Sequence, residues 1–110
     1  MRIEHVTLLV KDREKALAFF KDVLDFDHEL VDKHAWVIVG DQYIHITEDS
    51  GETTTDTFYH FCIEREDIDD YANKLKDRGV ELIDEQPGAS FFVKDLDGNL
   101  IEFSKPRNRF

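Results

Sequence analysis

An internal repeat constrains the fold of this chain more than any other feature of its sequence. His5 and His60 stand in the opening apolar segments of two similar halves, 55 residues apart (60 − 5), and His45 and Glu102 stand in the closing segments, 57 residues apart (102 − 45). A nearly constant spacing at both places predicts that one supersecondary unit occurs twice. The length of 110 residues fits one compact domain or two small units that share a core.

Each half has the pattern of one strand, one helix and three further strands. Asp12 and Asp67 are N-cap candidates for the helices, and Gly79 stands where a helix C′ residue belongs. The first half predicts an amphipathic helix of about 13 residues after Asp12 and strands at 2–10, 28–31, 35–39 and 42–47. The second half predicts a helix between Asp67 and Gly79 and strands at 58–64, 80–84, 90–94 and 99–104.

The predicted fold class is therefore α+β, with two tandem βαβββ modules that form mixed sheets and carry their helices on the outer face. We expect a single domain over residues 1–110, with module one at 1–48, a polar linker at 49–57 and module two at 58–105. A module of about 50 residues is marginal on its own, so the modules are expected to pack against each other or against a second chain.

Side-chain parity separates an apolar face from a polar face in four of the strands. Side chains alternate between the faces of a strand, and in each case the apolar face suits cover by a helix. The other face carries a potential metal ligand, namely His5, His45, His60 or Glu102. The small polar neighbours on that same face are Thr7, Thr47, Cys62 and Ser104. Histidines among small polar and aromatic groups suit a lined cavity, although any one histidine in a strand is more often a hydrogen-bonded or half-exposed residue than a ligand.

Composition limits the classes of partner. The formal net charge of −11 argues against nucleic acid and against anionic membrane surfaces. Cys62 is the only cysteine, the N-terminus is a poor signal peptide, and no apolar run approaches the length of a membrane span. These features predict a soluble, cytoplasmic protein.

Three motifs resemble the vicinal oxygen chelate superfamily, which includes glyoxalase I, the fosfomycin-resistance proteins, extradiol dioxygenases and the bleomycin-binding proteins. They are the opening IEHVTLLVKD with KALAFFKDVLDF, the restart FYHFCIE and the closing DLDGNLIEF, and the resemblance covers about residues 1–105. Leu96 replaces the proline of the family's closing motif, and Glu102 stands where its glutamate belongs. The resemblance implies paired βαβββ modules with curled sheets around a metal and a small-molecule substrate.

The resemblance also implies the metal ligands, one each from the first and last strands of both modules. By motif they are His5 and His45 in module one and His60 and Glu102 in module two. In many members the two pairs come from different chains, so a homodimer is expected. Three imidazoles and one carboxylate suit one divalent transition metal per site, such as Zn, Ni, Co, Mn or Fe.

Two chemistries fit this ligand set. In a glyoxalase I-like lyase or isomerase the metal stabilises an enediolate, and Glu102 and His45 would be the catalytic residues. His45, however, stands where glyoxalase I enzymes usually carry a second glutamate. In the alternative, His5, His60 and Glu102 alone bind the metal, as in fosfomycin-resistance proteins or an Fe(II) dioxygenase, and His45 acts as a neighbouring acid or base. Against fosfomycin, the loop at residues 85–90 is short and cationic groups are few.

A third possibility is a metal-free drug-binding protein of the bleomycin-resistance type. The residues expected to contact a substrate or ligand in any of these cases are Thr7, Trp36, Tyr43, Phe58, Cys62 and Phe92. Phe91 is a further candidate for an apolar lining, although ordinary core packing is the preferred explanation of the aromatic residues. Arg107 and Arg109 lie beyond Glu102 and could reach a site, although a solvated tail is the preferred explanation, and no role is assigned to His28 or His34.

Overall fold

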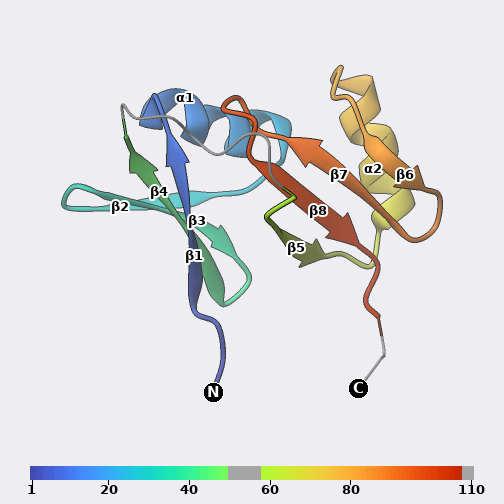
Figure 1. The fold of residues 1–110 in the computed structure, drawn as a ribbon, viewed down its shortest axis with the longest axis horizontal. Helices are drawn as coiled ribbons and strands as arrows, with labels where there is room; N and C mark the ends of the chain where they lie inside the picture. The colour runs from blue at the N-terminus through green and yellow to red at the C-terminus, as the bar shows by residue number, and fades with distance from the viewer. Residues whose placement is uncertain (50–57, 108–110) are drawn as a thin grey trace. The chain divides into compact units, whose positions relative to one another are not determined.

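The computed structural model describes residues 1–49 and 58–107 and divides the chain into two compact units, Met1–Thr54 and Thr55–Phe110 (Figure 1). Each unit is a βαβββ module with its own four-stranded mixed sheet, which confirms the predicted fold class. Apart from Asp49, the predicted linker at 49–57 lies outside the described residues.

The first unit holds β1 to β4 and one helical segment. Its sheet has the order β1-β4-β3-β2, in which β1 and β4 are parallel and the other pairs are antiparallel. Asp12 caps the helix as predicted, because its carboxylate accepts a hydrogen bond from the Lys15 backbone N–H at 3.0 Å. The elements are β1 (His5–Val10), α1 (Arg13–Ala18), a π-helical segment (Phe19–Val23), β2 (His28–Val31), β3 (His34–Val39) and β4 (Gln42–Glu48).

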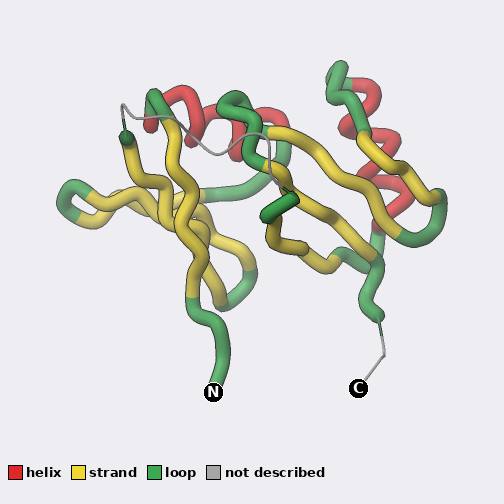
Figure 2. Tube along the Cα trace, in the orientation of Figure 1, coloured by secondary structure: helices red, strands yellow, loops and turns green. Residues whose placement is uncertain are grey.

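The second unit repeats this topology with the sheet order β5-β8-β7-β6. Its elements are β5 (His60–Glu64), α2 (Ile68–Asp77), β6 (Ile83–Gln86), β7 (Ser90–Lys94) and β8 (Leu100–Ser104). Figure 2 shows the helical segment of each module, in red, alongside the strands of its own sheet. No helix within residues 1–49 and 58–107 is long and apolar enough to cross a membrane.

Strand register shows that the duplication extends to single residues. In the first unit Thr7 pairs with His45 across the parallel β1–β4 ladder, and in the second Cys62 pairs with Glu102 across β5–β8. His5 and His60 therefore occupy equivalent positions, each two residues before the residue that pairs with the closing ligand candidate. This register brings the members of each candidate pair onto neighbouring strands.

The apolar faces form the cores, as parity predicts. In the first unit the core includes Leu8, Val10, Leu17, Phe20, Leu24, Ala35, Val37, Ile44 and Ile46. In the second unit Tyr71 of α2 contacts the rings of Phe91 and Phe103, all of them almost fully buried. His60 and Glu102 stand at the opposite parity, and Glu102 and Ser104 are nevertheless buried on that face.

Several elements differ from the predicted boundaries; the strand predicted at 58–64, for example, begins at His60. Three of the differences have physical reasons. The first strand begins at His5 rather than residue 2, because its ladder partner β4 begins only at Gln42. The helix after Asp12 continues as a π-helical turn, in which the Leu24 N–H donates to the Phe19 carbonyl at 3.2 Å. The strand predicted at 80–84 begins at Ile83 and contains a register shift, with Asp84 at a φ of 50°.

Candidate functional site

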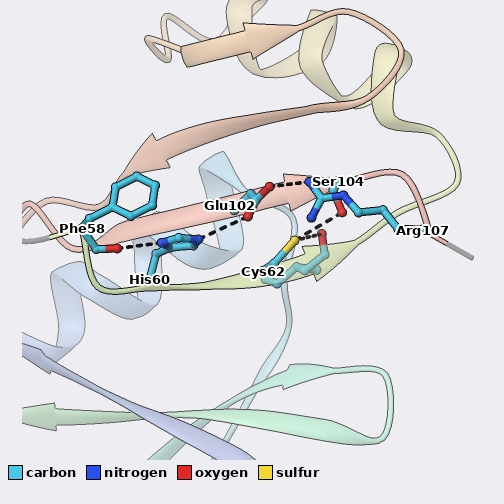
Figure 3. Close-up of polar contacts among 7 residues, drawn as sticks. Phe58, His60, Cys62, Glu102, Ser104 and Arg107 are labelled. Carbon is cyan, nitrogen blue, oxygen red and sulfur yellow. Dashed lines mark hydrogen bonds and ion pairs between the residues drawn. The ribbon is translucent and has the colours of Figure 1, made fainter. Parts of the chain in front are cut away.

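His60 and Glu102 form the centre of the polar face of the second unit (Figure 3). His60 opens β5 and Glu102 lies in the middle of the parallel neighbour β8, so the two side chains lie diagonally across one ladder. His60 Nε2 is 3.3 Å from Glu102 Oε1, and the two side chains are 21% and 10% exposed. The structure thus brings together the two ligand candidates that sequence assigned to this module.

The other nitrogen of His60 fixes how this pair can interact. His60 Nδ1 is 2.8 Å from the backbone carbonyl of Phe58, and a carbonyl oxygen only accepts hydrogen bonds. We assign the proton of the neutral ring to Nδ1 on this ground, which leaves the Nε2 lone pair directed at the carboxylate of Glu102. Two electron-rich atoms that face each other in a partly buried place are stabilised by a cation between or upon them. That cation is either a proton on Nε2 or a metal ion.

The geometry of the pair fits a metal ion. Two ligand atoms that each lie about 2.0–2.2 Å from one ion, at an angle of about 90° to 110°, stand about 3 to 3.5 Å apart. The Nε2–Oε1 distance of 3.3 Å falls in that range, whereas a direct charge-assisted N–H···O⁻ bond is usually shorter, about 2.7–2.9 Å. A ligating histidine whose second nitrogen donates to a carbonyl is also the usual arrangement at metal sites.

Within the described ranges, no group of three or more His, Cys, Asp or Glu side chains is arranged to hold an ion. His5 and His45 belong to the first unit and His60 and Glu102 to the second, and each pair is placed within its own unit. A site that uses all four residues therefore stays a prediction.

Arg107 contacts the second oxygen of Glu102, so the expectation of a solvated tail is wrong for this residue. Its Nη2 donates to Glu102 Oε2 at 2.7 Å, while its side chain stays 39% exposed. The chain is held there because the Lys105 N–H donates to the Ala89 carbonyl just after β8 ends. The hydrogen bond to Glu102 raises the pKa of Arg107. The guanidinium in turn supplies the buried carboxylate with a charged hydrogen-bond partner, which offsets the cost of burying a charge. Arg109 lies outside the described residues.

Aromatic and small polar side chains surround the pair. Phe58 and Phe92 present their rings to His60 at centroid distances of 4.7 and 4.9 Å, both nearly perpendicular to the imidazole. Cys62 pairs with Glu102 in register, and its thiol donates to Ser104 Oγ at 3.3 Å. Burial is the main cause that raises the pKa of the Cys62 thiol, so the group is a neutral neighbour. Phe91, by contrast, is part of the core.

The first unit gathers three histidines and a tryptophan. Trp36 stacks on His45 with ring centroids 4.3 Å apart, and His5 lies edge-on to Trp36 at 5.2 Å. His34 Nδ1 is 3.2 Å from His45 Nε2, so one ring donates to the other. Burial, and then His34 and His5, lower the pKa of His45, which favours its neutral form. The ring centroids of Tyr43 and Trp36 are 6.1 Å apart. Thr7 pairs with His45 in the β1–β4 ladder.

Two contacts at these sites are not predicted from the sequence. The first is that of His34 with His45, although His34 stands two residues before Trp36 in β3 and parity therefore places both on the same face. The contact of Arg107 with Glu102 has no such signal, because it depends on how the chain leaves β8.

Comparison with known proteins agrees with this fold. Residues 2–103 match the sequence model of the Glyoxalase/Bleomycin resistance protein/Dioxygenase superfamily. The chain belongs to this superfamily, which confirms the resemblance predicted from its motifs.

Fosfomycin-resistance proteins are among the relatives that this chain matches. The chain is 28% identical to fosfomycin resistance protein FosX of Listeria monocytogenes. The alignment is 114 positions long and covers 91% of this chain and 86% of the relative. It is 27% identical to glutathione transferase FosA of Serratia marcescens, covering 91% of this chain and 77% of that protein.

Solved structures show the same architecture. A putative glyoxalase family protein from Bacillus anthracis matches with a TM-score of 0.85 at 25% identity, over 97% of this chain and 96% of the other. A mutant of Listeria monocytogenes FosX, complexed with Mn(II) and 1S,2S-dihydroxypropylphosphonic acid, matches with a TM-score of 0.79 at 25% identity, over 97% and 94%.

Proposed function

We propose that this protein is a divalent-metal-dependent enzyme that modifies a small, oxygen-rich molecule, with His5, His60 and Glu102 as the metal ligands. The observation that carries the proposal is the approach of His60 Nε2 to Glu102 Oε1 at 3.3 Å, with Nδ1 of the same ring 2.8 Å from the Phe58 carbonyl. The Mn(II) in the related FosX structure supports a divalent transition metal, and manganese is the first ion to test.

Each residue has a definite part in this proposal. The bound ion supplies Lewis-acid chemistry, which polarises a substrate oxygen. His60 and Glu102 are held in place by the Phe58 carbonyl and by Arg107, so little rearrangement is needed when the ion binds. Phe58 and Phe92 give the site apolar walls that exclude water from one side of His60. The proposed substrate contacts remain Thr7, Trp36, Tyr43, Phe58, Cys62 and Phe92.

The three-ligand site is preferred because of the contact between His34 and His45. His45 Nε2 already lies 3.2 Å from His34 Nδ1, and Trp36 stacks on the same ring. Ligation through that nitrogen requires the hydrogen bond to break. A neutral His45 that is held in this way suits an acid or base beside the metal site. The named relatives make fosfomycin the first substrate to test.

A glyoxalase I-like reaction is the second candidate, and the neighbour described as a glyoxalase family protein favours it. It requires His45 as a fourth metal ligand. Glu102 and His45 would then transfer the proton in a reaction that passes through an enediolate. An extradiol-dioxygenase-like reaction would use the three-ligand set with Fe(II). Turnover of fosfomycin, turnover of hemithioacetals of glutathione or bacillithiol, and oxygen uptake on catechols separate these reactions.

His45→Ala separates the two ligand sets. We expect its affinity for Mn(II) to stay within about threefold of the wild type, because His45 is hydrogen-bonded to His34 and not to a proposed ligand. The loss of a true ligand should cost at least as much as the loss of a ligand's hydrogen-bonded partner, which is about 10- to 100-fold. Calorimetric titration of untagged protein measures it, with His60→Ala as the variant that must lose the metal. A loss of affinity in His45→Ala as large as in His60→Ala would instead establish the four-ligand, glyoxalase-like site.

The same proposal includes a cytoplasmic homodimer. The exposed apolar side chains next to the ligand-bearing strands, Ile3, Phe58 and Tyr59, support an assembly that covers them. Sedimentation equilibrium of the purified chain tests this, and a monomer at every concentration would reject it.

A further inference from the structure

Two imidazole rings of the first unit stand at the separation of two ligands of one metal ion. His34 Nδ1 is 3.2 Å from His45 Nε2. Two ligand nitrogens that each lie about 2.0–2.1 Å from one ion, on neighbouring coordination positions, stand about 3 to 3.5 Å apart. Without an ion, one of the two neutral rings donates its proton to the other. An ion that replaces this shared proton has both nitrogens directed at it.

Strand pairing and an aromatic ring hold the two histidines in this position. Trp36 pairs with His45 across the antiparallel β3–β4 ladder, and His34 stands two residues earlier in β3, so the three side chains share one face. Trp36 stacks on the His45 ring with the centroids 4.3 Å apart and an interplanar angle of 16°. The pair is therefore preorganised, which lowers the entropic cost of binding an ion.

The pair is accessible from solution and offers neutral nitrogen donors. His34 is exposed and His45 is half-buried. Burial, and then His34 and His5, lower the pKa of His45, so its ring is in the neutral form that binds metals. The net charge of −11 attracts cations to the protein. Sites made of imidazole nitrogens suit Ni(II), Cu(II) and Zn(II), and affinity rises along the series from Mn(II) to Cu(II).

We propose that His34 and His45 bind a second metal ion, a nitrogen-preferring divalent ion such as Cu(II), Ni(II) or Zn(II), at a site separate from that of the proposed function. Water would fill the remaining coordination positions, because within residues 1–49 and 58–107 no third His, Cys, Asp or Glu side chain joins the pair. This site has no carboxylate donor, whereas the proposed catalytic site has one, so the two sites differ in the ions that they prefer. The competing explanation is a hydrogen bond between the rings that has no part in metal binding.

The fluorescence of Trp36 reports on this pair. Trp36 is the only tryptophan of the chain, and its ring stacks on that of His45. Cu(II) bound to His45 quenches tryptophan emission at this short range. His60→Ala is the parent protein for the titration, because it lacks a ligand of the proposed catalytic site and keeps both His34 and His45. Cu(II) is titrated into the untagged parent protein and into the same protein carrying His34→Gln or Glu29→Gln.

The two added substitutions separate ligation from general attraction of cations. His34→Gln removes the imidazole and keeps a side chain that can hydrogen-bond with His45. Glu29→Gln is the matched control, because Glu29 is exposed and pairs with Trp36 in the β2–β3 ladder, on the same face. It removes a carboxylate that attracts Cu(II) and leaves both histidines in place.

We expect saturable quenching in the parent protein and an affinity for Cu(II) about 10- to 100-fold weaker in His34→Gln, since the loss of a ligand should cost at least as much as the loss of a ligand's hydrogen-bonded partner. Glu29→Gln should change the affinity by less than about threefold, because attraction between exposed charges is screened. No saturable quenching in the parent protein, an unchanged affinity in His34→Gln, or an equal loss in both variants overturns the inference. Titration of the wild type with Mn(II) tests the proposed function separately, so either can fail without the other.

Discussion

His60→Ala and Glu102→Gln are each expected to lower the affinity for Mn(II) by more than about 100-fold, a loss larger than that caused by removing an outer partner of a ligand. His60→Ala removes the nitrogen that faces the carboxylate, and Glu102→Gln replaces an anionic oxygen donor by a neutral amide while it keeps the shape. Both side chains lie on the polar face, so neither change should disturb the packing of α2 on the sheet.

Calorimetric titration with Mn(II) measures the loss, and circular dichroism confirms that each variant is folded. Glu81→Gln is the control for the change of charge, because Glu81 is an exposed carboxylate of the same unit. It should bind Mn(II) as the wild type does. Wild-type affinity in both His60→Ala and Glu102→Gln would contradict the assignment of this pair as ligands.

The second large effect is expected for Phe103→Ala, which should destabilise the second unit by about 3–5 kcal/mol. Phe103 is fully buried, one position after Glu102 and therefore on the opposite face of β8. Its ring contacts those of Tyr71 and Phe91 at centroid distances of 5.1 and 5.6 Å, so alanine leaves a cavity between α2 and the sheet. A unit of about 50 residues has little stability to lose.

Urea unfolding followed by circular dichroism gives the change in the free energy of unfolding. Leu96→Ala is the control, because Leu96 is also a large apolar residue of this unit but is 62% exposed. Its change should stay within about 0.5 kcal/mol. A similar midpoint for Phe103→Ala and Leu96→Ala would show that Phe103 contributes no more to the core than a surface leucine does.

The sequence predicts the architecture well because the repeat and the strand parity are local properties. The spacings between His5 and His60 and between His45 and Glu102 predict two equivalent modules. The structure confirms them, because Thr7 pairs with His45 in one module as Cys62 pairs with Glu102 in the other. Alternation along each strand then assigned the apolar side chains to the helix-covered face, where the structure has them.

The missed contacts depend on where side chains and chain ends lie in space. His34 reaches His45 diagonally across the β3–β4 ladder, which requires the register to be known. Arg107 reaches Glu102 only because a hydrogen bond from Lys105 to Ala89 directs the chain after β8. The short β6 and the π-helical turn likewise follow from pairing partners and packing rather than from residue preferences.

Metal stoichiometry of the wild-type chain tests the central claim most directly. Untagged protein is incubated with excess Mn(II), passed through a desalting column and analysed by mass spectrometry for all divalent transition metals. We predict about one ion per chain, with affinity that is lost in His60→Ala and Glu102→Gln. Protein that retains no metal, and that takes up no Mn, Ni, Zn, Co or Fe(II) in calorimetry, would contradict the account and leave a metal-free binding protein of the same fold.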